Sequence, residues 1–69
     1  MMEKHIMVTG SSTVSWKDAV LQTIQEAAKT LDYLTGVTII NQKAKINGKK
    51  IIEYYVDLDI TFMIDRDRE

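Results

Sequence analysis

The sequence predicts a single α+β domain of order βαββ, in which one helix packs on one face of a three-stranded antiparallel or mixed sheet. Three observations predict it. Apolar residues recur with a helical period between Trp16 and Tyr33. An Asn-Gly pair at 47–48 separates two strand-like segments. Apolar and polar residues then alternate, with few interruptions, as far as Ile64. The domain is expected to span residues 1–69.

The first two elements have clear beginnings and ends. A short, partly β-branched apolar segment at Lys4–Thr9 predicts a strand that ends at Gly10. Ser15 is a suitable N-cap for the helix, and Asp18 suits the positive end of the helix dipole. The helix is expected to stop before Gly36. Its apolar positions repeat every three or four residues, as on one buried face: Trp16, Val20, Ile24, Ala27, Leu31 and Leu34.

The Asn-Gly pair predicts a hairpin between strands Val37–Ile46 and Lys49–Ile64, joined by a type I′ turn at 47–48. Counting back from that turn pairs Asn41 with Tyr54 on the helix side of the sheet. The same count pairs three positions of the open side with residues of the last strand: Gly36 with Asp59, Thr38 with Asp57, and Ile40 with Tyr55.

The order of the strands follows from the connections. A right-handed strand–helix–strand crossover makes the first two strands parallel. The hairpin makes the last strand antiparallel to the second. Placing the last strand in the middle satisfies both relations and gives the order 1-3-2. One helix then leaves the second face of the sheet open, with apolar residues among polar ones: Ile40, Ile51, Tyr55 and Met63 beside Thr38, Gln42, Glu53, Asp57 and Asp59.

Size and composition favour self-association. A domain of about 60 residues buries only about 60% of the surface of its unfolded chain. The 69-residue sequence has no cysteine, which excludes disulfides and thiolate metal sites. A single histidine, His5, cannot form a histidine-based metal site, and no metal ligand set is predicted. Assembly with further copies is the remaining means of stabilisation, and it would cover the open sheet face.

Other functional classes lack their sequence signals. Nine basic and ten acidic residues give a net charge of −1, without the basic excess of a nucleic-acid binder. No apolar run approaches the roughly 20 residues that span a bilayer. The N-terminus has no apolar segment of signal-peptide length, so a cytoplasmic location is expected. No nucleophile, base or oxyanion-binding set is evident, so neither enzymatic activity nor catalytic residues are predicted.

Several segments resemble the dodecin family over about Ile6 to Ile64: VTGSS, SWKDAV and AAKTLDYL, followed by a hairpin and the strand YYVDLDITF. The resemblance implies small βαββ subunits that assemble as hollow dodecamers. It also implies that flavins (riboflavin, FMN or FAD) bind in pairs at subunit interfaces, with their rings stacked between tryptophans. The implied role is ligand binding and storage.

The implied flavin positions carry unusual residues here. The resemblance places the stacking tryptophan at Gly36 and a glutamine of the last strand at Tyr55. Asn41 stands where many members carry an acidic group facing the ligand's polyol chain. A glycine has no π-face, so the usual tryptophan pair cannot stack at this position. The predicted cofactor-binding residues are therefore Gly36, Thr38, Asn41 and Tyr55, with Tyr55 as the alternative aromatic ring.

Two alternatives remain open. The first is a structural or cation-binding assembly without flavin. Asp57 and Asp59 project from one face of a strand about 7 Å apart, and such carboxylates can bind Ca²⁺ or Mg²⁺. Ion pairs with Lys43, Lys45 or Arg66 would account for the same two residues. The second alternative is a monomeric or dimeric module that binds a partner through the open sheet face.

Overall fold

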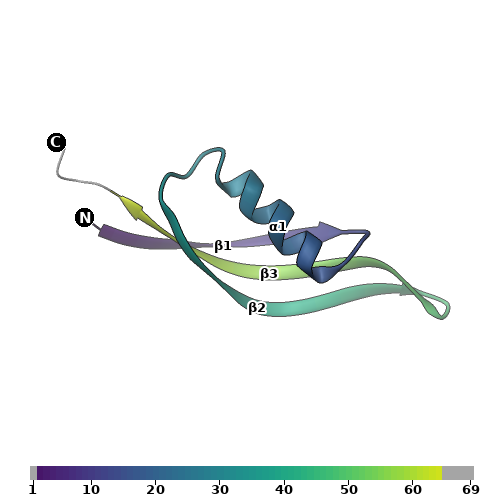
Figure 1. Cartoon of the computed structure of the whole chain (residues 1–69). Coiled ribbons are helices and arrows are strands. Elements are labelled where there is room, and N and C mark those ends of the chain that lie inside the picture. The colour runs from purple at the N-terminus through teal and green to yellow at the C-terminus, as the bar shows by residue number, and fades with distance from the viewer. Residues whose placement is uncertain (1, 65–69) are drawn as a thin grey trace.

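The structure, a computed structural model, describes residues 2–64. The elements follow in the order β1 (Met2–Ser12), α1 (Trp16–Ala27), β2 (Leu34–Asn47) and β3 (Lys50–Ile64) (Figure 1). The strands form one sheet in the order β1-β3-β2, and β3 is antiparallel to both neighbours. α1 lies over one face (Figure 1). The predicted fold class and strand order are confirmed.

The core lies between α1 and the middle strand. Alternate residues of β3 point toward the helix and are buried: Val56, Leu58, Ile60 and Phe62. Ala19 of α1 is fully buried against them, and Val8 of β1 packs at the edge. Among the described residues of β2, only Leu34 joins this core. The hydrophobic effect therefore holds α1 on β1 and β3, and β2 lies to one side of it.

Trp16 fixes the start of the helix on the sheet. Its ring meets the ring of Tyr54 edge to face, with centroids 4.8 Å apart and planes at 78°. Such edge-to-face pairs are a favoured aromatic geometry. The indole Nε1 donates a hydrogen bond of 2.9 Å to the backbone oxygen of Lys43 on β2. Trp16 therefore serves as a packing anchor on the helix side of the sheet.

The first strand is longer than predicted, since it continues through Gly10 to Ser12. A Cβ at position 10 would overlap Thr23 Oγ1, so the glycine allows β1 and α1 to approach closely. Ser12 is buried and makes two local hydrogen bonds. Its Oγ donates to Asp18 Oδ2 at 2.6 Å and accepts from the backbone N–H of Val14 at 2.9 Å. These bonds end the strand and lead into the helix.

The predicted N-cap is confirmed. Ser15 has an extended backbone (φ −170°, ψ 166°), and its Oγ accepts a hydrogen bond of 3.0 Å from the backbone N–H of Asp18. Ser15→Ala is expected to lower the free energy of unfolding by about 1 kcal/mol, because one N–H at the helix start loses its partner. Ser15→Asp should retain most of the stability, since it keeps an acceptor. Urea denaturation checks both, and equal losses would contradict the capping role.

The helix is shorter than predicted: it ends at Ala27 and not at Tyr33. Residues 28–30 form a turn, in which the N–H of Thr30 donates to the oxygen of Ala27 at 3.2 Å. Tyr33 then adopts the left-handed region with φ 57°, which redirects the chain into β2. Leu34 pairs with Phe62 in the sheet and does not extend the helical face. Leu34 follows the helical period in the sequence, but pairing with β3 places it in a strand instead.

The hairpin turn lies one residue later than predicted. Asn47 pairs with Lys50, so the turn residues are Gly48 and Lys49. Gly48 has φ +66° and is the only glycine of residues 2–64 with positive φ. Positive φ at the first turn residue alone is typical of type II′, which places glycine there. The predicted type I′ turn at 47–48 is therefore wrong, although the hairpin itself is confirmed.

The predicted register is also wrong. Register shifts occur between Leu34 and Gly36, between Ile39 and Asn41, and between Lys45 and Ile46. Thr38 pairs with Asp59 instead of Asp57, and Asn41 pairs with Asp57 instead of Tyr54. Because opposite residues share a face, Asn41 lies on the open side, and Gln42, opposite Val56, lies on the helix side. Each bulge adds one residue and exchanges the faces of the residues that follow.

Candidate ligand-binding face

The four residues predicted to contact a cofactor all lie on the sheet face that α1 leaves open. Tyr55 is on β3, and the other three are on β2, each opposite an odd-numbered residue of β3. The even-numbered residues of β3 from 56 to 62 are buried under the helix, so the odd-numbered side chains point away from it. The pairs follow one another along β2 and β3 as a single strip: Gly36–Thr61, Thr38–Asp59, Asn41–Asp57 and Lys43–Tyr55. We call this strip the open-face strip.

The strip has two separate ends. Gly36 lies opposite Thr61, and Tyr55 is six positions back along β3, which corresponds to about 20 Å. Tyr55 therefore cannot provide a stacking ring beside Gly36 within the same chain. Thr38 lies next to Gly36, whereas Asn41 lies near Tyr55. The structure thus brings the predicted residues onto one surface in two groups, and only a second copy can bring the two ends together.

Asp57 is the centre of the hydrogen-bond network on this face. Its Oδ1 accepts a hydrogen bond of 2.9 Å from Thr9 Oγ1 on β1. Its Oδ2 lies 3.2 Å from Lys43 Nζ and accepts a longer bond, 3.4 Å, from Asn41 Nδ2, both on β2. The predicted ion pair with Lys43 is confirmed, and Arg66 lies outside the described residues. Asp57 therefore connects all three strands.

These contacts favour the charged form of Asp57. The hydrogen bond from Thr9 and then the bond and charge of Lys43 hold the pKa of its carboxyl group below its usual value. A pKa that is lower in the folded chain stabilises the fold above the unfolded value of about 3.9. That contribution is lost as the pH falls through the folded pKa.

Asp57→Asn should therefore flatten the acid end of the stability curve. Between about pH 5 and about pH 2, the wild type should lose more free energy of unfolding than the variant, because only the wild type must protonate this carboxylate. Urea denaturation at each pH measures the difference. Asp32→Asn, at an exposed position, is the matched control and should keep the wild-type dependence. Parallel curves for the wild type and Asp57→Asn would contradict the assignment.

Two further contacts order the face. His5 Nδ1 on β1 lies 2.9 Å from Asp59 Oδ1, and Tyr55 donates a 2.7 Å hydrogen bond to Glu53 Oε1. That hydrogen bond, followed by burial, raises the pKa of the Tyr55 phenol. Tyr55 therefore stays a neutral ring with a hydroxyl group at physiological pH. Sequence reasoning missed His5 and Thr9, because it did not pair β1 with β3 residue by residue.

The charged groups of the strip are not arranged as a preformed metal centre. Within residues 2–64, no three side chains of His, Cys, Asp or Glu come close enough together to hold a metal ion. Both carboxylate oxygens of Asp57 already have partners within the chain, and Asp59 contacts His5. A cation would have to displace Lys43 or gain further oxygen ligands from another copy.

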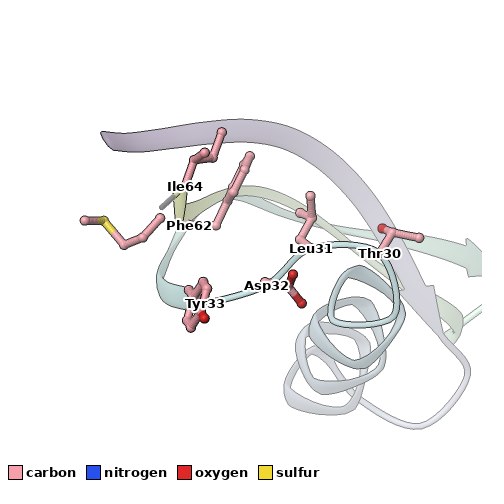
Figure 2. A pocket seen from close by; sticks show the side chains of 7 residues that line it. Thr30, Leu31, Asp32, Tyr33, Phe62 and Ile64 are labelled. Atoms are coloured by element: carbon pink, nitrogen blue, oxygen red, sulfur yellow. The ribbon is translucent and has the colours of Figure 1, made fainter. Parts of the chain in front are cut away.

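A separate pocket of about 220 Å³ lies where the loop after α1 meets the end of β3 (Figure 2). Tyr33 and Asp32 come from the loop, and Phe62 and Ile64 come from β3. The N–H of Met63 donates to the oxygen of Tyr33 at 3.0 Å, which closes the loop onto the strand. None of the predicted cofactor-binding residues lines this pocket, so it is distinct from the open-face strip.

Comparisons with known proteins agree with this architecture. The dodecin from Streptomyces davaonensis is 20% identical, with a TM-score of 0.88 over 94% of this chain and 96% of that chain. A variant of the Thermus thermophilus dodecin is 23% identical, with a TM-score of 0.89 over 94% of this chain and 97% of that chain. The calcium dodecin from Mycobacterium tuberculosis, whose crystal structure has a novel calcium-binding site, is 24% identical, with a TM-score of 0.81 over 100% and 99%.

These likenesses show a shared fold. No curated protein matches the sequence. In the described part of the chain, no helix is long and apolar enough to cross a membrane. The profile of the family named Dodecin matches residues 3–65, which is nearly the whole sequence. The chain therefore belongs to the dodecin family.

Proposed function

We propose that the chain forms a closed homo-oligomer, a dodecamer, that binds and stores a flat small ligand of the flavin type on its open sheet face. The observation that carries the proposal is the open-face strip, which contains all four residues expected at the ligand. Membership of the dodecin family supports it. The role is binding and storage, without turnover of the ligand.

Exposed apolar residues support assembly. Ile6, Met7 and Ile40 are all more than one third exposed in a single copy, as are the three isoleucines near the hairpin turn. Exposed apolar surface of this extent marks protein contacts. Light scattering tests the assembly directly. Twelve chains of 7.9 kDa give about 95 kDa, whereas a mass near that of one or two chains would contradict it.

The strip offers a flavin two kinds of contact. Tyr55 supplies a neutral aromatic ring, and aromatic rings stack on one another with offset or edge geometry. Thr38 and Asn41 carry hydroxyl and amide groups that can hydrogen-bond to a polyol chain. Gly36 has no side chain, so a ring can lie against the backbone there, beside Thr61, whose Oγ1 would lie 3.0 Å from a Cβ at this position. The proposed site uses Tyr55 from one copy and the Gly36 end of the strip from another.

Quenching of flavin fluorescence tests the ligand. Titration of riboflavin or FMN with the wild-type assembly should quench the fluorescence, because stacking on an aromatic ring shortens the excited state. Tyr55→Ala should weaken this quenching. Tyr33→Ala is the matched control, since Tyr33 is 58% exposed but belongs to the pocket at the other end of β3. No quenching at micromolar flavin would reject flavin as the ligand and would leave the assembly untouched.

A cation-binding assembly is the second candidate. Asp57 and Asp59 lie on the same open face, and the structurally similar protein from Mycobacterium tuberculosis is a calcium dodecin. Because Lys43 Nζ lies 3.2 Å from Asp57 Oδ2, Ca²⁺ would compete with the ammonium group. Calorimetric titration should then show tighter Ca²⁺ binding for Lys43→Met than for the wild type. Equal absence of heat in both proteins would reject this candidate.

A further inference from the structure

The helix side of the sheet is only partly covered. α1 packs on β1 and β3, so an apolar groove remains between α1 and β2. We define the α1–β2 groove by Val20, Leu21 and Ile24 on the helix and Val37 and Ile39 on the strand. Its two hollows have volumes of about 310 Å³ and 180 Å³. Leu21 is 48% exposed and Ile39 is 46% exposed, so the single copy leaves this groove unfilled.

The hairpin tip, residues 44–53, is a second uncovered apolar surface. Pairing of β1 with β3 ends at Ser12 and Tyr54, so only two strands continue beyond that point. Figure 1 shows this part of β2 and β3 projecting past the ends of α1 and β1. Its three isoleucines are exposed: Ile46 by 65%, Ile51 by 44% and Ile52 by 42%. Two strands without a packed face are marginally stable in water, so a surface that covers the isoleucines would stabilise the tip.

The dimensions of the chain agree with a hairpin that projects from the core. The radius of gyration is 14.5 Å, and the extents are 55 × 19 × 12 Å. A compact domain of this length would have a radius of about 11 Å. The chain is therefore elongated, in agreement with a hairpin tip that projects past the core.

Like charges disfavour the simplest symmetric cover, in which two tips pack on each other. The tip carries Lys45, Lys49 and Lys50, and its acidic residue Glu53 lies opposite Lys45. Tips related by a twofold axis would bring the lysines at the turn, Lys49 and Lys50, close to their copies, which is unfavourable. A different surface therefore suits the tip better. The α1–β2 groove is apolar and matches it in length, since α1 has 12 residues, or about 18 Å, and the tip extends about 15 Å.

We propose that the hairpin tip of one copy occupies the α1–β2 groove of a neighbouring copy. The inference rests on the proposed function only in that the chain assembles with itself. Contact between two different surfaces of the same chain closes into a ring when the rotation between neighbours allows it. The tip thus gains a cover, the groove is filled, and β2 of the receiving copy is held against its helix.

Introduced cysteines test this contact cleanly, because the sequence contains none. Ile46→Cys places a thiol on the tip, and Leu21→Cys places one in the groove, both at exposed positions. In the double variant each chain carries both halves of the contact. Oxidation or a short bismaleimide should then join the chains into a ladder of covalent multimers on a denaturing gel. Neither single variant should form the ladder, because disulfides require Cα atoms about 4.4–6.8 Å apart.

The control pairs Ile46→Cys with Val14→Cys, since Val14 is 70% exposed and lines neither hollow of the groove. A similar ladder from this pair, or dimers from Ile46→Cys alone, would overturn the proposed contact. So would the absence of multimers in a double variant that keeps the particle mass of the wild type. A wild-type chain that is monomeric by light scattering would instead overturn the assembly itself, so the two failures are distinguishable.

A charge at the tip provides a second test. Ile46→Asp buries a carboxylate in an apolar groove, so the assembly should dissociate at a protein concentration roughly tenfold higher or more. Val14→Asp adds the same charge outside the groove and should leave the dissociation concentration of the assembly unchanged. Mass photometry over a dilution series measures both. An Ile46→Asp assembly as resistant to dilution as the wild type would contradict the proposal.

Discussion

Leu58→Ala is expected to lower the free energy of unfolding by about 2–5 kcal/mol. Leu58 is fully buried at the centre of β3, where it packs beneath α1 among Ala19, Val56 and Ile60. The substitution removes apolar surface from the core and leaves a cavity that a three-stranded sheet with one helix cannot readily close. Small domains have about 5–15 kcal/mol of stability in total, so the loss is a large fraction.

Circular dichroism during heating measures this effect. For a domain of this size, each kcal/mol shifts the melting temperature by about 4–8 °C. The wild type and variant must be compared at one protein concentration, because assembly adds to the apparent stability. Val14→Ala is the control: Val14 is 70% exposed, and its truncation should stay within about 0.5 kcal/mol of the wild type. An equally small loss of unfolding free energy for Leu58→Ala would contradict a core centred on Leu58.

Gly36→Trp is expected to increase the affinity for flavin by roughly 5-fold to 150-fold, since one aromatic stacking contact contributes about 1–3 kcal/mol. The substitution restores the ring that the family resemblance places at this position. A Cβ at residue 36 would lie 3.0 Å from Thr61 Oγ1, so a combined Gly36→Trp/Thr61→Ala variant relieves the close contact. Fluorescence titration with riboflavin compares the affinities.

Val14→Trp is the matched control for the added ring. Val14 is 70% exposed and lies outside both the open-face strip and the α1–β2 groove. The same tryptophan at this position should leave the affinity for flavin at the wild-type level. A gain in both variants would mean that an added aromatic ring binds flavin non-specifically. No gain in Gly36→Trp, in particles of wild-type mass, would place the ligand away from this end of the open-face strip.

The order of the elements could be predicted from the sequence because its signals are local. Alternation along β3 identifies the buried face through Val56, Leu58 and Ile60, all of which are buried in the structure. Ser15 marks the start of the helix, and the pair at 47–48 indicates a hairpin. Chain connectivity then leaves one simple arrangement of three strands, with the last strand in the middle.

The candidate site was predicted only in part. The sequence indicated an open face with Thr38, Tyr55, Asp57 and Asp59, and the structure places these residues there. It assigned Asn41 to the wrong face, because a bulge between Ile39 and Asn41 has no characteristic residue to reveal it. The flavin-binding role of these residues remains a prediction that the titrations above test.

The sequence by itself determined the βαββ order, the buried face of β3 and the start of the helix, since each depends on side chains a few positions apart. Only the tertiary structure decided where the helix ends, how β2 is aligned and which residues meet across the sheet. The helical apolar period extends to Leu34, yet that residue pairs with Phe62 in the sheet. Long-range strand pairing sets these details, and its energy depends on contacts that no local pattern encodes. The network centred on Asp57 joins residues of all three strands and exists only once they are aligned.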